Sequence, residues 1–177
     1  MDKRKIENLR VKKDITDTLL SLMHEKPFAK ITISEIIEKA GVARASFYRN
    51  YESKEDVLMT LVDDILEDFA NKADYDLSNY YTYNHVLRCF QYFKRYKKYV
   101  MGLYEFGYGI RLLEKLNRFH ERISKPEVMT SISKYKVYIF MGALFNTAIT
   151  WLENGAEERA EDIAKVFCEE ICNNKFI

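Results

Sequence analysis

The pattern of apolar and polar residues between Thr32 and Asn50 predicts two short helices joined by a tight turn. Thr32 is followed three residues later by Glu35, the spacing of a capping box at the start of a helix. Gly41 is expected to end this first helix, because glycine adopts a positive φ without steric cost. Residues 43–50 then predict a second helix of about two turns. One apolar side of the first helix is formed by Ile33, Ile36 and Ile37.

The second helix has two chemically different sides. Phe47 and Tyr51 are four residues apart and are predicted to face a core. The other side is cationic and rich in hydroxyl groups, through Arg44, Ser46, Tyr48 and Arg49. A short helix of this kind, supported by another across a glycine turn, is typical of a DNA-reading helix-turn-helix.

Helical periodicity continues on both sides of this motif. A preceding helix is predicted over residues 6–25, and residues 2–5 (DKRK) are expected to be a mobile arm whose basic side chains contact DNA. The buried stripe of that helix is expected to contain Ile15, Leu19, Leu22 and Met23. A following helix is predicted over residues 53–71, with an acidic outer face and the apolar residues Leu58, Leu61, Val62, Ile65, Leu66 and Phe69.

The second part of the chain predicts further helices after a polar, tyrosine-rich linker at residues 73–83. Their expected ranges are 83–96, 98–105, 108–122, 128–154 and 157–174. Residues 137–152 are apolar almost all round, so this helix must be covered on two sides. One side is assigned to the core of its own domain and the other to a partner subunit.

Composition supports an all-α fold of about nine helices. The chain has 177 residues and is 47% hydrophobic, and its six Gly and two Pro are too few for a many-turned β fold. We expect residues 1–60 to form a three-helix DNA-binding domain with its motif at 32–51, and residues 61–177 to form a helical regulatory and dimerisation domain. The net charge of +1 hides a segregation, because basic residues outnumber acidic ones before residue 55 and the reverse holds immediately after it.

Cysteine content, charge and the motifs present indicate the cellular compartment and argue against catalysis. Three cysteines, a charged N-terminus and the lack of a long uncharged run indicate a cytoplasmic protein, nucleoid-associated when bound to DNA and without a membrane partner. We find no glycine-rich phosphate loop, no metal-ligand spacing and no activated nucleophile, so no enzyme, cofactor or metal is predicted. His24, His85 and His120 are scattered along the sequence.

Residues 9–60 resemble the DNA-binding domain of the TetR (tetracycline-repressor, AcrR-like) family of bacterial regulators. The resemblance is carried by Thr32-Ile33, Glu35-Ile36, Ala40-Gly41-Val42, Ser46-Phe47-Tyr48, Tyr51, Ser53-Lys54-Glu55 and Leu58. It implies a transcriptional regulator that binds a double-stranded DNA operator. The expected DNA-contacting residues are Thr32, Ile33, Ala43, Arg44, Ala45, Ser46, Tyr48, Arg49, Asn50 and Lys54.

Individual roles follow from side-chain chemistry. The guanidinium of Arg44 fits guanine O6/N7 or a phosphate, and Ser46 can bind a base edge. Tyr48 and Arg49 are expected at phosphates, whereas Asn50 can contact either a base or a phosphate. Lys54 resembles the family's phosphate-binding lysine at a helix N-terminus.

The resemblance extends more loosely to Gly142-Ala143-Leu144 and Trp151-Leu152-Glu153-Asn154-Gly155, which are similar to the last helical hairpin of many family members. It implies a homodimer, a palindromic operator and release of DNA by an effector. We expect the dimer interface to contain Phe140, Ala143, Leu144, Thr147, Trp151, Phe167 and Ile171. A pocket for an unidentified small-molecule effector is expected at Phe90, Phe93, Met101, Tyr104, Tyr108 and Phe145.

Two alternatives stay open at this point. The aromatic residues of 75–108 are also compatible with an ordinary core. The same fold also suits a co-activator or adaptor that is controlled by a protein partner instead of a small ligand.

Overall fold

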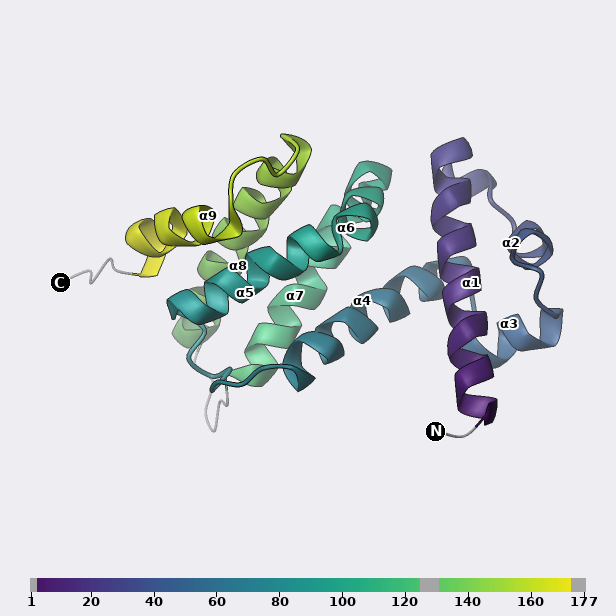
Figure 1. Ribbon diagram of the computed structural model, residues 1–177, viewed down its shortest axis with the longest axis horizontal. Coiled ribbons are helices and arrows are strands. Elements are labelled where there is room, and N and C mark those ends of the chain that lie inside the picture. The colour runs from purple at the N-terminus through teal and green to yellow at the C-terminus, as the bar shows by residue number, and fades with distance from the viewer. Residues whose placement is uncertain (1–2, 125–130, 173–177) are drawn as a thin grey trace. The chain divides into compact units, whose positions relative to one another are not determined.

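The computed structural model describes residues 3–124 and 131–172, and every regular element in these ranges is helical (Figure 1). This confirms the predicted all-α class. The first helices are α1 (Lys3–Glu25), the short 3₁₀ turn η1 (Phe28–Lys30), α2 (Ile33–Ala40), α3 (Arg44–Asn50) and α4 (Lys54–Asn71). The others are α5 (Tyr83–Arg95), α6 (Lys97–Leu103), the π-helical turn η2 (Tyr104–Tyr108), α7 (Gly109–Ile123), α8 (Ser131–Glu153), α9 (Ala160–Phe167) and the π-helical turn η3 (Cys168–Cys172).

The chain divides into two compact units, Met1–Ile65 and Leu66–Ile177. The division falls inside α4, whereas the sequence placed it at residues 60/61. One uninterrupted helix therefore contributes its first part to the N-terminal unit and its last turns to the C-terminal unit.

The N-terminal unit has its core between α1, α2, α3 and the start of α4. Helices α2 and α3 both pack against α1. The predicted stripe of α1 is confirmed, because Ile15, Leu19, Leu22 and Met23 are all buried. Phe47 and Tyr51 are buried with them, so the inner side of α3 is also as predicted.

The turn of the motif has the predicted geometry. Gly41 adopts a left-handed conformation with φ of 63°, and its N–H donates back to the last turn of α2. At the other end of α2 the hydroxyl of Thr32 accepts from the amide of Glu35 at 3.3 Å. The expectation of a mobile arm at residues 2–5 is wrong from Lys3 onward, because α1 already begins there. Residue 2 lies outside the described ranges.

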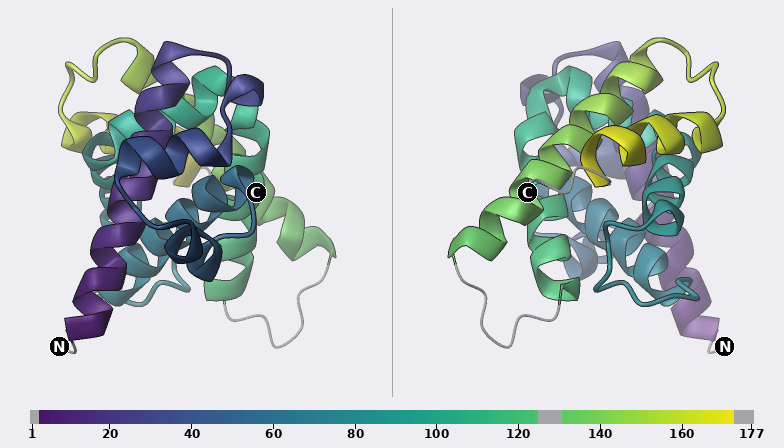
Figure 2. Two further views of the ribbon diagram at one scale, coloured as in Figure 1. Left: turned by 90° about the vertical axis from the view of Figure 1, so that its right-hand side faces the viewer. Right: turned by 90° about the vertical axis from the view of Figure 1, so that its left-hand side faces the viewer.

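In the C-terminal unit, α5 runs alongside α9 and also contacts α8 (Figure 2). Helices α6 and α7 pack against α8 as well, so α8 contacts several helices of its unit. Its inward side is fully buried at Phe140, Met141, Leu144 and Ala148. None of the helices in the described ranges is long and apolar enough to cross a membrane.

Two predicted boundaries in this unit are corrected. The last helix begins at Ala160 instead of residue 157, because Gly155 and Ala156 take consecutive positive φ angles that close α8 and leave residues 157–159 in a loop. The break predicted at Gly107 is present as a kink with φ of 84°, although π-helical turns continue across it. The predicted start of α8 at 128 and the end of the last helix at 174 lie outside the described residues.

Candidate nucleic-acid interface

Helix α3 has a short exposed side opposite the side that is buried in the core. Phe47 is completely buried and its ring packs edge-on against Tyr48, with ring centroids 5.4 Å apart. Because the inner side is fixed in the core, the opposite side is held at a defined rotation about the helix axis. Ala43, Ala45, Tyr48 and Arg49 are exposed on that outward side.

Arg44 is the side chain best fixed for recognition. Its guanidinium donates to the hydroxyl of Ser34 on α2 at 3.2 Å and to the hydroxyl of Tyr48 at 3.3 Å. It also lies over the Tyr48 ring, 5.3 Å from the centroid. The guanidinium carries five donors, so these two bonds leave others for an acceptor outside the protein. Holding an exposed arginine in advance reduces the side-chain entropy lost on binding.

Ser46 and Asn50 are less accessible than the residues around them. Both are half-buried, and the Asn50 amide donates to the Ser46 carbonyl at 2.8 Å. This bond occupies one of the two amide donors of Asn50 and leaves its oxygen and second donor. This contact within α3 was not predicted from the sequence.

The start of α2 supplies backbone donors. The Thr32 hydroxyl satisfies the amide of Glu35, while the helix has no internal acceptor for the first-turn amides of Ile33 and Ser34. Beside them, Glu35 binds the ammonium of Lys26 at 2.6 Å. This hydrogen bond is the main reason that the pKa of Glu35 is lowered, with further contributions from the Thr32 backbone and Lys39. The carboxylate is thus paired with a cation beside the first turn of α2, where phosphate contacts were predicted.

Lys54 makes contacts inside the protein that were not predicted from the sequence. Its ammonium donates to the carbonyl oxygens of Phe28 at 2.6 Å, Ile31 at 2.8 Å and Ala29 at 3.4 Å. An ammonium has three donors, so all of them are directed at the η1 turn. The same group lies 4.4 Å from the centre of the Phe28 ring. Lys54 therefore joins the first turn of α4 to the η1 turn, and the expectation that its side chain holds a phosphate is not supported by this geometry.

Replacing Lys54 with Met is expected to lower the free energy of unfolding by about 1–2 kcal/mol, because the part-buried carbonyls of Phe28 and Ile31 lose a charge-assisted partner. Urea denaturation of the two proteins measures this difference. Lys30→Met is the matched control, since it removes the same charge from an exposed lysine of the η1 turn. Unchanged stability together with a flatter salt dependence of DNA binding would restore the phosphate role of Lys54.

The predicted pocket residues do not all lie together. The rings of Phe93 and Tyr104 both approach Phe145, with centroids 6.3 and 6.4 Å away. Phe90 belongs elsewhere, because it is fully buried between Trp151 and Phe167 in the core of the unit. Met101 and Tyr108 are half-buried.

The predicted interface residues are mostly inside the protomer. Phe140, Leu144, Trp151 and Phe167 are at most 4% exposed, so these four side chains are covered within the single chain, and their place in an interface stays a prediction. Ala143, Thr147 and Ile171 are half-buried. An alternative apolar surface exists on α8 and α9, where the exposed residues are Ile132, Tyr135, Tyr138, Ile139 and Val166.

The histidines are not all scattered in space. His85 of α5 and His120 of α7 are buried, and their Nε2 atoms are 3.0 Å apart. Residues that are 35 positions apart in the sequence carry no mutual signal in its periodicity. The four-residue spacing of His85 and Cys89 on one amphipathic helix is the indication of this cluster that the sequence contains.

Comparison with known proteins finds a family match for the segment that contains α2 and α3. Residues 15–60 match the family described as bacterial regulatory proteins, tetR family. Over 60 residues the chain is 37% identical to the HTH-type transcriptional regulator EthR of Mycobacterium tuberculosis (strain CDC 1551 / Oshkosh), an alignment that covers 34% of this chain and 26% of EthR. The chain thus spans about a quarter of the length of that curated relative.

Solved structures extend the likeness to the whole fold. A TetR transcriptional regulator from Streptococcus agalactiae 2603V superposes with a TM-score of 0.64 at 20% identity, over 95% of this chain and 97% of that one. The dihydroxyacetone kinase operon activator DhaS gives a TM-score of 0.59 at 14% identity, over 91% of this chain and 96% of that one. At these identities the likeness concerns the arrangement of helices.

Proposed function

We propose that this chain, which belongs to the TetR family of bacterial regulatory proteins, is a homodimeric repressor that binds a palindromic DNA operator and is released by an effector. Membership in a family of DNA-binding transcriptional regulators also means that it is not an enzyme. The observation that carries the proposal is the outward face of α3, where Arg44 is held by Ser34 and Tyr48 above a fully buried Phe47.

The contacts divide into base reading and positioning. Arg44 and Ala45 lie at the start of α3, the end that enters the major groove in helix-turn-helix proteins. Arg44 has the donor geometry for guanine, and Ala45 has a methyl group for contact with thymine. Arg49, Tyr48 and the first-turn amides of α2 are assigned to phosphates, which fix the register of the protein without reading sequence.

Dimerisation is proposed to use the exposed face of α8. Ile132, Tyr135, Ile139 and Ala143 recur at helical spacing, and Ile139 is 65% exposed. On α9, Val166 is 59% exposed. Exposed apolar side chains aligned on a helix are typical of a surface that is covered in an assembly. Of the residues predicted from sequence, Ala143 lies on this stripe.

An effector is proposed to bind beside Phe93, Tyr104 and Phe145. These rings converge from α5, the η2 turn and α8, and Tyr104 is exposed enough to be displaced. Gly109 is packed closely against the Tyr104 ring, since a Cβ built there would be 2.8 Å from Tyr104 Cδ2. Movement of Tyr104 is thus linked sterically to the first turn of α7.

The alternative function keeps the fold and replaces the small effector with a protein partner. One structural neighbour, DhaS, is described as an operon activator, so this helical arrangement also occurs in a protein that activates. Isolation of the chain from cells with a stoichiometric protein partner would favour this alternative. A ligand-induced rise in melting temperature without such a partner would favour the effector.

The proposed function is tested by titrating fluorescent DNA from upstream of the chain's own gene, at several salt concentrations, against unrelated DNA of equal length. We expect specific binding with a dissociation constant between about 10⁻⁸ and 10⁻¹¹ M and a steep, linear fall of log affinity with log salt. Equal affinity for both DNAs would contradict the proposal.

A further inference from the structure

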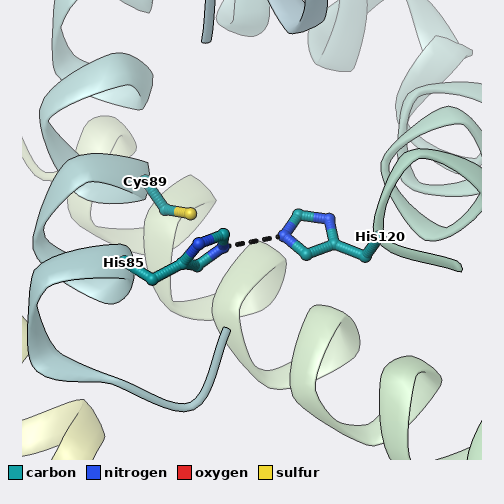
Figure 3. Close-up of side chains that lie close together, drawn as sticks. All are labelled: His85, Cys89 and His120. Carbon is teal, nitrogen blue, oxygen red and sulfur yellow. Dashed lines mark hydrogen bonds between the residues drawn. The ribbon is translucent and has the colours of Figure 1, made fainter. Parts of the chain in front are cut away.

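His85, Cys89 and His120 form a buried cluster that the proposed DNA binding does not use. Their potential ligand atoms all lie within 4.8 Å of one another. Figure 3 shows His85 and Cys89 projecting from one helix toward His120 on another. All three side chains are less than 9% exposed.

Hydrogen bonds fix which nitrogen each histidine offers. Nδ1 of His120 lies 3.0 Å from the carbonyl oxygen of Leu116, which can only accept, so this nitrogen carries the proton. A neutral His120 therefore offers its Nε2 lone pair toward His85. On the other side, Nδ1 of His85 is 3.4 Å from the hydroxyl of Tyr75. Both Nδ1 atoms have a partner in the protein, and both Nε2 atoms face the centre of the cluster.

Burial favours the neutral form of both imidazoles. Burial lowers the pKa of His85 to about 3, with a further contribution from His120, and burial lowers the pKa of His120 to about 4. Neutral imidazole is the form that binds metals. Burial raises the pKa of the Cys89 thiol, so this group is protonated until a cation replaces its proton.

We propose that His85, Cys89 and His120 bind a single thiophilic divalent cation of the Zn²⁺ type, through the two Nε2 atoms and Sγ. Two imidazoles and one thiolate are a ligand set that suits Zn²⁺ and not the oxygen-preferring Mg²⁺ or Ca²⁺. At Zn–N distances of about 2.0–2.1 Å, tetrahedral angles require the two Nε2 atoms to be about 3.3 Å apart. The observed 3.0 Å is short of this by a few tenths of an ångström, which a small rotation of either ring supplies.

Binding of the cation requires two protons to move. The Cys89 thiol loses its proton to solvent as the sulfur–metal bond forms. The proton that His85 shares with His120 through Nε2 moves to Nδ1, where the Tyr75 oxygen accepts it. Three protein ligands leave one tetrahedral position for water or a further donor.

Both histidines have hydrogen-bond partners of their own, and a neighbouring segment offers a route for the ion. Leu116 and Tyr75 are the kind of outer partners that orient metal-binding histidines. Tyr75 and Tyr80 come from the non-helical segment between α4 and α5, and the Tyr80 ring packs edge-on against both His85 and His120. Irregular segments open at lower free energy than the helices they join, so this segment is the expected entrance.

Binding at this cluster would act on the end of α4, a step that rests on the proposed function. Phe69, in the last turn of α4, packs edge-on against the His85 ring at 5.5 Å. Arg88, on the same helix as His85, donates to the Phe69 carbonyl at 3.0 Å. A shift of His85 toward a cation thus reaches the helix that also carries Lys54 in the N-terminal unit.

The test titrates the full-length, metal-free protein with Co²⁺, a spectroscopic substitute for Zn²⁺. We expect one equivalent to produce a thiolate-to-cobalt charge-transfer band with tetrahedral d–d absorption, both abolished by Zn²⁺. Cys89→Ala is expected to remove the charge-transfer band, and Cys172→Ser, which changes another cysteine, is expected to retain it. Tyr75→Phe is expected to keep the band and weaken affinity by about tenfold or more, as for an outer-shell partner.

Several outcomes overturn the site. One is a folded wild-type protein, verified by circular dichroism, that shows no charge-transfer band; another is a band that survives in Cys89→Ala. Loss of the band in Cys172→Ser would place the ion at the C-terminal thiols instead.

DNA affinity measured with and without Zn²⁺ tests the regulatory step separately. A change in wild type that is absent from Cys89→Ala supports this step, and unchanged affinity overturns it while the ion site stands. Failure of the protein to bind DNA specifically both with and without Zn²⁺ would count only against the proposed function.

Discussion

Ile139→Glu is expected to convert the proposed dimer into a monomer. The substitution puts a charge at the middle of the exposed stripe of α8, where Ile139 is 65% exposed in the single chain. An unpaired carboxylate buried in an interface costs several kcal/mol, more than an exposed isoleucine contributes to the stability of the protomer. Sedimentation or light scattering at micromolar concentration measures the change in mass.

The same variant is expected to lose operator affinity by about 10² to 10⁴, because each half-site must then be bound without the help of the other. Gln91→Glu is the matched control, since it adds the same charge at an exposed position of α5. The variant and control are expected to have equal circular dichroism spectra. A wild-type monomer, or a dimeric Ile139→Glu protein, would show that this face is not the interface.

Arg44→Ala is expected to cost about 1–3 kcal/mol of specific DNA binding, the range for loss of a bidentate base contact. The structural reason is the fixed position of the guanidinium between Ser34 and Tyr48. Competition titrations with operators mutated at one base pair at a time measure where specificity is lost. We expect the loss to concentrate at one position of each half-site.

Two further variants separate base-specific recognition by Arg44 from general electrostatic attraction to DNA. Arg44→Lys keeps the charge but not the planar fork, so specificity at that position should fall while the salt dependence is retained. Arg118→Ala is the control for Arg44→Ala, because it removes an arginine charge from an exposed site on α7. Uniform weakening on every DNA sequence would reduce Arg44 to a phosphate contact.

Local signals explain what the sequence predicted correctly. Thr32 as a cap, Gly41 at positive φ and Phe47 facing inward each depend on residues within one or two turns. Because these features are determined by neighbouring residues, the helix-turn-helix was predicted nearly to the residue. The DNA-contacting set as a whole stays a prediction.

Contacts between distant segments explain what was missed. Lys54 donates to carbonyls 23 to 26 positions earlier, which no periodicity can indicate. Helix α8 is apolar on nearly all sides, so its pattern did not distinguish the buried Phe140 from the exposed Ile139. His85 and His120 meet only because α5 and α7 come together in the C-terminal unit.

Helix α4 is anchored by polar contacts at both of its ends. Lys54 holds the carbonyls of η1 at its start, and Arg88 and Tyr92 bond to Phe69 and Asp68 in its last turns. Its 18 residues make a rod about 27 Å long. A tilt of one degree at either end displaces the other by about 0.5 Å over that length. In the proposed dimer, a tilt of a few degrees would therefore be enough to misalign the two α3 helices with the helical repeat of the DNA.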